Sequence, residues 1–176
     1  GLFYNALTTY LGFGSNDEYK VMGLSSYGTP KFVDDFLKII SVKNGKLLIN
    51  KEYIDEFRYP FLKKKFYQKF GPSRKPDSKI SKHYINIASS VQKIFEDCAI
   101  SQINYLQKAT KLKKLVIAGG CALNGLMIGK IIEKTNFKKV FVPPAPGDDG
   151  LSLGSAFYVN QIIYKKKKKL NKSASL

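Results

Sequence analysis

The sequence contains little cysteine, histidine or arginine, and no long apolar run. Its two cysteines, Cys98 and Cys121, are not spaced as metal ligands, and no disulfide framework is expected, which suits a reducing compartment. His83 is the single histidine, so no pair of histidines is available for zinc. No apolar run approaches the roughly 20 residues of a membrane span, and no signal peptide is visible. These absences predict a cytoplasmic protein without a membrane segment.

The formal net charge of +17 comes almost entirely from lysine, because Arg58 and Arg74 are the only arginines. Nucleic-acid sites usually rely on arginine for bidentate and stacking contacts, so this composition argues against a nucleic-acid partner. Residues 53–70 interleave aromatic and basic side chains, a pattern that can bind single strands but more often packs its rings inward. Residues 165–176 are expected to form a solvated, lysine-rich tail. Because of the net charge and the pattern of residues 53–70, a non-catalytic, basic nucleic-acid-binding module stays open as an alternative.

Hydrophobic periodicity predicts the elements of the first two thirds of the chain. Apolar residues at spacings of three and four predict helices over 2–11, 17–24, 32–40 and 82–109. The last of these is the longest, and it is expected to be a scaffolding helix. Residues 39–49 predict a β-hairpin, because an Asn-Gly pair at its centre favours a type I′ turn.

The last third reads as strand, glycine turn, helix, strand, turn and helix. Residues 115–118 and 140–142 are short apolar runs typical of buried strands, and 126–133 has the composition of a crossover helix. Turns follow at 119–120 and 147–150. The chain is therefore predicted to be an α/β protein in which both turns face one crevice, at the carboxyl ends of neighbouring strands.

The residue types in these turns suit a nucleotide. Gly119 and Gly120 let a ligand approach the backbone, and the amides that lead into the next helix favour an anion such as phosphate. Asn124 can hydrogen-bond a base, a sugar or the backbone, and Asp148 stands where a carboxylate would meet a metal or a sugar hydroxyl. In the alternative interpretation the glycines only close turns, Asp149 caps the last helix, and nothing binds.

Acidic residues also open the second helix. Asp17 and Glu18 in a first turn suit the helix dipole, so simple capping explains them. In a functional interpretation, an acidic side chain contacts ribose hydroxyls and Lys20 contacts phosphate.

Several motifs, in the right order along nearly the whole chain, resemble those of one enzyme family. Residues 16–28 look like the signature EYKVMGLAPYG of the NodU/CmcH/TobZ-type O-carbamoyltransferases. Residues 118–125 are similar to the GGVALN motif of that family, and 144–156 resemble PAAGDAGxALGAA. Residues 70–74 and 87–92 fit as well.

The resemblance implies an actin-like ATPase fold of the Kae1-like type, with a mixed sheet flanked by helices. Residues 1–164 would form its second lobe, as a piece of a longer protein with an upstream lobe and a downstream YrdC-like domain. The family uses ATP and carbamoyl phosphate to form a carbamoyl-adenylate, and then carbamoylates the hydroxyl of a small-molecule acceptor. The chain alone is expected to be inactive. A component of tRNA threonylcarbamoyl transfer is the alternative enzyme.

The resemblance also implies site residues, although it assigns no catalytic residue. Those that would lie near the nucleotide are Asp17, Glu18, Lys20, Gly119, Gly120, Asn124 and Gly147. Asp148 matches a carboxylate that helps to hold iron or a similar divalent metal, whose other ligands lie in the upstream lobe. The family has a small residue where this sequence has Asp149, so an extra carboxylate stands at the site.

Overall fold

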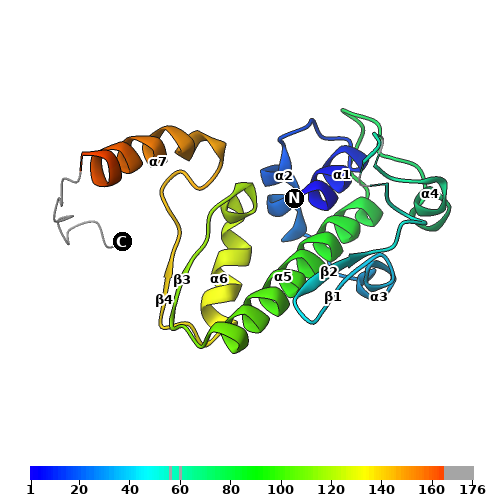
Figure 1. Cartoon of the computed structure of the whole chain (residues 1–176). Coiled ribbons are helices and arrows are strands. Elements are labelled where there is room, and N and C mark those ends of the chain that lie inside the picture. Colours follow the sequence, from blue (N-terminus) through cyan, green and yellow to red (C-terminus); the bar gives the residue numbers. More distant parts are fainter. Residues whose placement is uncertain (56, 60, 165–176) are drawn as a thin grey trace.

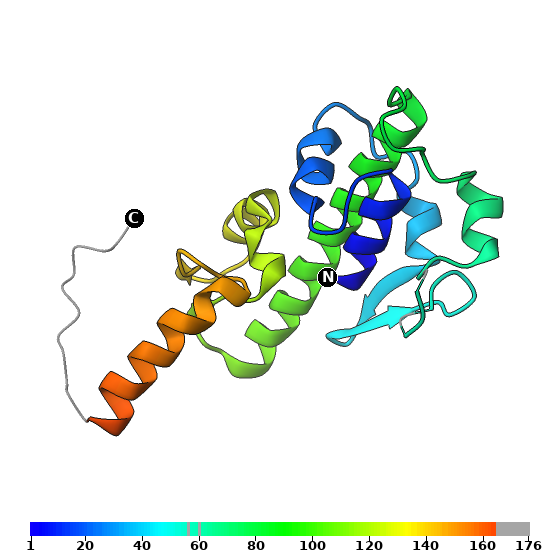
Figure 2. The same ribbon diagram turned by 90° about the horizontal axis from the view of Figure 1, so that it is seen from above.

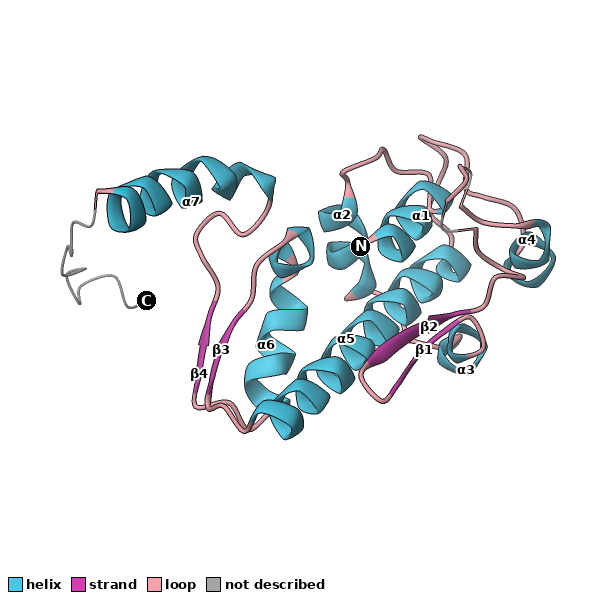
Figure 3. Cartoon of the chain, viewed as in Figure 1, coloured by secondary structure: helices cyan, strands magenta, loops and turns pink. Residues whose placement is uncertain are grey.

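The computed structural model describes residues 1–164 except for residues 56 and 60, so the lysine-rich segment 165–176 lies outside the described residues. In the described residues, helices surround a β-hairpin in the first part of the chain, and a strand–helix–strand unit with a further helix follows (Figures 1 and 3). In chain order the elements are α1 (Leu2–Tyr10), α2 (Glu18–Ser25), α3 (Val33–Leu37), β1 (Ile40–Lys43), β2 (Lys46–Ile49), α4 (Lys64–Phe70), α5 (Lys82–Thr110), β3 (Lys114–Val116), the 3-10 turn η1 (Gly120–Leu123), α6 (Gly125–Lys134), β4 (Lys139–Phe141), the 3-10 turn η2 (Asp148–Gly150), α7 (Leu151–Tyr158) and the π-helical turn η3 (Val159–Ile163). The predicted α/β class is confirmed, whereas the actin-like lobe stays a prediction.

Helix α5 is the scaffold on which the other elements assemble. It runs for 29 residues and carries neither glycine nor proline. Its C-cap residue is Lys111, whose φ of 59° is left-handed. In the view of Figure 1 it crosses the middle of the molecule diagonally, with α1, α2 and α6 on one side and the hairpin on the other. This confirms the predicted helix over 82–109. Residues far apart in sequence thus share α5 as a common support.

The larger core lies along the first half of α5. Side chains of α1, α3, α4 and the hairpin meet there, and aromatic rings fill much of the space. Phe36 stacks on Phe70 with ring centroids 4.8 Å apart, and Tyr10 meets Phe66 edge to face at 5.1 Å. Such pairs add about 0.5–1.5 kcal/mol each to the gain from burial. The inward packing predicted for 53–70 therefore holds for α4.

The hairpin and its flanks confirm one expectation and correct another. Strands β1 and β2 pair antiparallel, and both turn residues have positive φ, 50° at Asn44 and 73° at Gly45, as a type I′ turn requires. The helix predicted over 32–40 is shorter, because α3 ends at Leu37 and Ile40 already starts β1. Pairing with β2 outweighs the helical periodicity of this segment.

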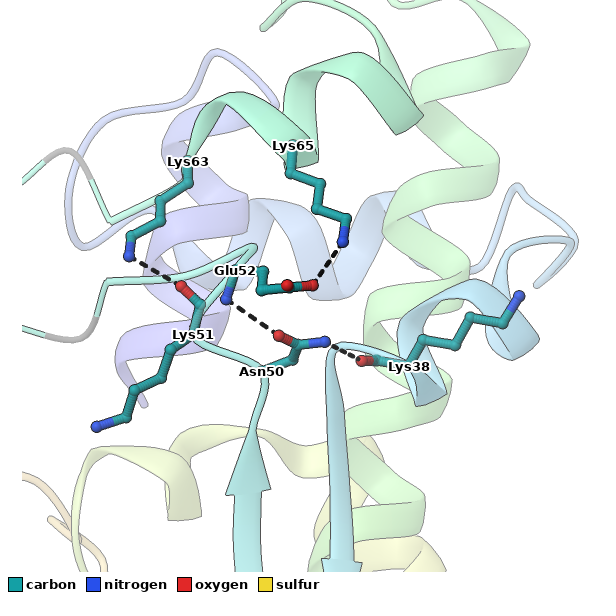
Figure 4. A network of polar contacts seen from close by, with 6 residues as sticks. All are labelled: Lys38, Asn50, Lys51, Glu52, Lys63 and Lys65. Atoms are coloured by element: carbon teal, nitrogen blue, oxygen red, sulfur yellow. Dashed lines mark hydrogen bonds and ion pairs between the residues drawn. The ribbon is translucent and has the colours of Figure 1, made fainter.

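The segment after the hairpin is held by polar contacts (Figure 4). The Asn50 side chain donates to the Lys38 carbonyl at 3.2 Å and accepts from the Glu52 amide at 3.0 Å. The Glu52 carboxylate then pairs with the Lys65 ammonium of α4 at 2.5 Å. Both partners of this ion pair are exposed, so it fixes geometry more than it stabilises the fold.

A second, smaller core lies between the second half of α5, α6 and a parallel pair of strands. Strands β3 and β4 pair in register from Lys114–Lys139 to Val116–Phe141. Leu115, Met127 and Ile131 are its buried residues, and Phe95 of α5 packs against both cores. The βαβ order predicted for this region is thereby confirmed.

The expectation that both strands are buried is wrong. Val116 and Phe141 are 69% and 55% exposed, because α5 and α6 cover only the face to which Leu115 points. In the described part of the chain, β3–β4 and β1–β2 form two separate sheets of two strands each, so one mixed sheet is not seen. Parallel sheets are usually covered on both faces, whereas in the described residues only one face of β3–β4 is covered.

Helix α7 leads away from both cores (Figure 2). Every residue of Leu151–Tyr158 is exposed, although most of these side chains are apolar and none is charged. Within the described residues, no helix is both long enough and apolar enough to cross a membrane.

Candidate nucleotide-binding site

The glycine turn after β3 and the turn after β4 are in direct contact. The Gly119 amide donates a hydrogen bond of 2.6 Å to the Pro146 carbonyl, and Gly147 follows in the second turn. An added Cβ on Gly147 would lie 3.7 Å from Cδ1 of Leu123, which belongs to η1. The structure thus brings the two predicted glycine turns to one edge of the sheet.

The first turn is open to an approaching ligand. Gly119 has a φ of +101°, a region that only glycine adopts without strain. An added Cβ at Gly119 or Gly120 would meet nothing within 4 Å. Gly120 and Cys121 begin the 3-10 turn, where the first amides have no carbonyl partner inside the turn. Exposed backbone with free amides at the start of a helical segment suits an anion.

Asn124 has its side chain engaged within the fold. Its Oδ1 accepts from the Met127 amide at 2.9 Å and so caps the N-terminus of α6. The same oxygen accepts from Nε2 of Gln92 at 3.0 Å, while Nδ2 of Asn124 donates to Oε1 of Gln92 at 2.9 Å. Burial raises the pKa of the Tyr4 hydroxyl, and a hydrogen bond from the Asn124 side chain opposes this rise. Asn124 shapes the turn first, and its contact with a nucleotide stays a prediction.

Gln92 lies in the same region, but no role for it is predicted from the sequence. It belongs to the stretch 87–92 that resembles the family, but nothing in its local pattern indicates a long-range partner. The available signal is an amide on the apolar side of α5, one residue after Val91 and two before Ile94. Such a polar residue, 4% exposed, requires buried partners.

The second turn presents two carboxylates to solvent. Asp148 and Asp149 lie in η2 and are both exposed. An added Cβ on Gly150 would come within 2.1 Å of the Ala145 carbonyl oxygen, so glycine is required for the tight turn. The alternative interpretation expected Asp149 to cap α7, but no side chain caps that helix and its N-cap residue is Gly150. Asp148 is therefore available at the same edge as the glycine turn.

These carboxylates do not form a metal site by themselves. In the part of the chain that the structure describes, no group of three or more His, Cys, Asp or Glu side chains could hold a metal ion. A divalent metal at Asp148 would need ligands from elsewhere.

Asp17, Glu18 and Lys20 lie together at the N-terminus of α2. Oδ2 of Asp17 accepts from the Gly14 amide at 3.0 Å and from the Lys20 ammonium at 2.9 Å. The hydrogen bond from Lys20 lowers the pKa of the Asp17 carboxyl, and the same contact raises the pKa of Lys20. Because Asp17 binds the loop before α2, its side chain does not cap the helix itself. Oε1 of Glu18 accepts from Nδ2 of Asn5 on α1 at 2.7 Å.

Helix α1 connects this corner to the glycine turn. The Tyr4 hydroxyl donates to Oε1 of Gln92 at 2.7 Å, one residue before the Asn5 that contacts Glu18. At the start of the same helix, an added Cβ on Gly1 would lie 3.9 Å from Sγ of Cys121. Two groups of predicted site residues are therefore linked through α1 and α5, although no direct contact joins them.

An apolar cavity of about 480 Å³ lies beside the glycine turn. Phe3, Phe61 and Phe95 line it, and of the turn itself only Cys121 reaches it. Cys121 is exposed, whereas Cys98 is buried. Burial raises the pKa of the Cys98 thiol to about 11. The predicted nucleotide residues lie outside this cavity, at the edge of the β3–β4 sheet and at the N-terminus of α2.

Comparison with known proteins identifies the class. A family model described as "Carbamoyltransferase N-terminus" matches residues 1–157, nearly the whole of the described chain. The class is therefore that of the carbamoyltransferases, as the motifs predicted. The chain belongs to the carbamoyltransferase N-terminus family.

Curated relatives agree with this assignment. The chain is 37% identical over 167 residues to an uncharacterized protein of Synechocystis, covering 90% of this chain and 27% of that protein. It is 30% identical over 168 residues to the nodulation protein NolO of Bradyrhizobium diazoefficiens, covering 91% of this chain and 28% of NolO. It is also 30% identical over 164 residues to the nodulation protein NolNO of Sinorhizobium fredii, covering 91% and 22% of the two chains. The chain thus spans about a quarter of the length of these relatives.

Proposed function

We propose that this chain is part of an ATP-dependent O-carbamoyltransferase. The enzyme would activate carbamoyl phosphate with ATP as a carbamoyl-adenylate and transfer the carbamoyl group to a substrate hydroxyl. The observation that carries the proposal is the hydrogen bond from the Gly119 amide to the Pro146 carbonyl. It joins an open backbone turn to a turn with an exposed carboxylate, in a chain that belongs to the carbamoyltransferase family.

Each predicted residue has a distinct role in this proposal. The amides at Gly120 and at the start of α6 would neutralise phosphate oxygens through fixed backbone donors. Gly119 and Gly147 would keep the two turns close enough to form one wall. Lys20 would contact phosphate only after exchanging its partner Asp17, because the two side chains form an ion pair of 2.9 Å.

Asp148 would supply one ligand to a divalent metal such as iron, which would act as a Lewis acid when bound. The described residues offer no complete ligand set, so the other ligands of such a metal would have to come from elsewhere in the protein. The binding site for the carbamoyl acceptor and the other metal ligands would be contributed by parts of the protein comparable to the remaining three quarters of its relatives.

The test is nucleotide binding by calorimetry, with ATP and ADP as titrants. The decisive variant is Gly120→Val, whose side chain would point into open space and therefore leaves the fold intact. Gly129→Ala is the matched control, because an added Cβ there also meets nothing within 4 Å and the position lies in the middle of α6.

We expect ATP to bind the wild-type chain and the Gly129→Ala variant equally, and Gly120→Val to weaken binding by about tenfold or more. Unchanged affinity in Gly120→Val would refute the site. Absence of nucleotide binding in the chain, and also in a chain extended to the full length of its relatives, would refute the function.

A further inference from the structure

The side-chain amide of Gln92 uses all of its hydrogen-bonding capacity inside the protein. Nε2 donates to Oε1 of Glu96 at 2.8 Å and to Oδ1 of Asn124 at 3.0 Å. Oε1 accepts from the Tyr4 hydroxyl at 2.7 Å and from Nδ2 of Asn124 at 2.9 Å. An amide has two donors and two acceptor sites, so every position is filled. With 4% of its surface exposed, Gln92 has no access to water as a substitute partner.

The neighbours of Gln92 allow only one orientation of its amide. Burial raises the pKa of the Tyr4 hydroxyl, so this group stays protonated and acts as a donor at physiological pH. The Met127 backbone amide can only donate, so Asn124 presents its oxygen to Met127 and to Nε2 of Gln92. The nitrogen of Gln92 therefore faces Asn124 Oδ1 and Glu96, and its oxygen faces Tyr4.

The amides of Gln92 and Asn124 therefore hold each other in one orientation. Oδ1 of Asn124 accepts from the Gln92 nitrogen, and the same oxygen accepts from the Met127 amide at 2.9 Å. Asn124 is the residue at which η1 ends and α6 begins. The position of the glycine turn thus depends on a side chain of α5 that lies 32 residues earlier.

We infer that Gln92 is a positioning residue that holds the glycine turn in place relative to α1 and α2. Through Asn124 it supports the turn that begins at Gly120. Through Tyr4 it is tied to α1, where the adjacent Asn5 holds Glu18 of α2 at 2.7 Å. Gln92 is therefore the common support of both groups of predicted nucleotide contacts. Its effect on ligand binding rests on the proposed function, whereas its effect on the turn does not.

The first measurement is hydrogen exchange at the start of α6, in the absence of nucleotide. Gln92→Met keeps a side chain of similar length but removes all four hydrogen bonds. We expect exchange of the Met127 amide to accelerate by about tenfold or more relative to amides of the β1–β2 hairpin, because the N-cap loses its support.

Asn86→Leu is the matched control on the same helix. Asn86 is 5% exposed, and its Oδ1 accepts from the amide and the hydroxyl of Thr29 at 3.0 and 3.3 Å. Its loss also leaves buried polar groups unpaired, but its partner Thr29 lies in the loop between α2 and α3, so exchange at Met127 should rise no more than elsewhere. Equal acceleration throughout the protein in Gln92→Met would refute the inference.

Tyr4→Phe provides a milder second variant if Gln92→Met does not fold. It keeps the ring that packs edge to face on Phe95 at 5.1 Å and removes only the hydroxyl that orients Gln92. A smaller acceleration, again concentrated at Met127, is expected. No selective change in this variant would refute the orienting role of Tyr4 and, with it, the inference.

The second measurement is ATP affinity in the same variants. We expect Gln92→Met to weaken binding by about tenfold and Asn86→Leu by less than about threefold. Wild-type affinity in a Gln92→Met chain with a loosened turn would show that the turn does not position nucleotide. If the wild-type chain binds no ATP at all, the proposed function fails while hydrogen exchange still decides the role of Gln92.

Discussion

Replacing Arg74 by lysine should destabilise the protein far more than a change between two cations suggests. Arg74 is 7% exposed, and its guanidinium donates to three backbone carbonyls. Nε reaches Leu11 at 2.6 Å, Nη1 reaches Ser78 at 2.5 Å, and Nη2 reaches Gly12 at 3.2 Å. The guanidinium also lies 5.1 Å from the centre of the Phe13 ring. Arg74 thereby joins the end of α1 to the loop before α5.

The magnitude follows from what lysine cannot reproduce. A single ammonium cannot reach three carbonyls that surround a planar fork, so two of these hydrogen bonds are lost. Hydrogen bonds to a charged group contribute about 1.5–3 kcal/mol each, and partial compensation by water at the edge of the site reduces the sum. We expect Arg74→Lys to lower the free energy of unfolding by about 2–4 kcal/mol.

Urea unfolding followed by circular dichroism, with linear extrapolation to water, measures this change. Arg58→Lys is the matched control, because Arg58 is the other arginine of the chain and is exposed. Its substitution should change the free energy of unfolding by no more than about 0.5 kcal/mol. A loss below about 1 kcal/mol in Arg74→Lys would show that the three carbonyls find other partners, and the reasoning would be refuted.

Four further results are expected. Gly28→Ala should destabilise the protein by about 1–3 kcal/mol, because its methyl group would lie 2.5 Å from a carbonyl oxygen of α5. Gly23→Ala in α2 meets nothing within 4 Å and should stabilise the protein by about 0.5–1 kcal/mol. Thermal unfolding of the two variants measures both changes. Because burial raises the pKa of Cys98 from 9.0 to about 11, its contribution to stability should be complete below pH 9 and lost between pH 9 and 11 in urea titrations. At neutral pH iodoacetamide should modify Cys121 but not Cys98 in the folded protein, and equal labelling of both would contradict their burial. Amides of α7 should exchange almost as fast as in an isolated short helix, because Leu151–Tyr158 is exposed along its whole length.

Elements with a strong local signal were predictable from the sequence. Apolar residues recur at helical spacing from Tyr84 to Leu106 of α5, and the helix carries no helix breaker, so neighbouring side chains determine the structure largely by themselves. The Asn44-Gly45 pair fixes the hairpin turn for a similar reason, since few other residues adopt its two positive φ angles. The order β3, α6, β4 follows from short apolar runs bounded by glycine and proline.

Features that depend on a second layer were not predictable in the same way. Val116 and Phe141 read as buried strand residues, but their burial requires an element on the far face of the sheet, and α5 and α6 both pack on the near face. The helix predicted through Ile40 fails because β2 supplies hydrogen-bond partners that periodicity does not register. Local pattern predicts the type of an element better than its partner.

The polar network of the candidate site shows the same limit more sharply. Asn124 was predicted as a possible nucleotide contact from its place after the glycine pair. Its pairing with Gln92 spans 32 residues, and no spacing rule links two such amides. Both residues were visible in sequence as parts of family-like motifs, yet only the folded chain shows that one supports the other.

Gly119 and Gly120 of the first turn have different roles in the structure, although the sequence suggests the same role for both. Gly119 is needed for its φ of +101°, and its amide is already used by Pro146, so it cannot donate to a ligand. Gly120 has no positive φ that would exclude other residues, and its Cβ position is empty. Substitution at Gly119 therefore perturbs folding first, whereas substitution at Gly120 perturbs only what approaches the turn. A loss of ATP binding in Gly120→Val with unchanged stability would thus report on the ligand itself, and Gly119→Ala cannot replace it as a test.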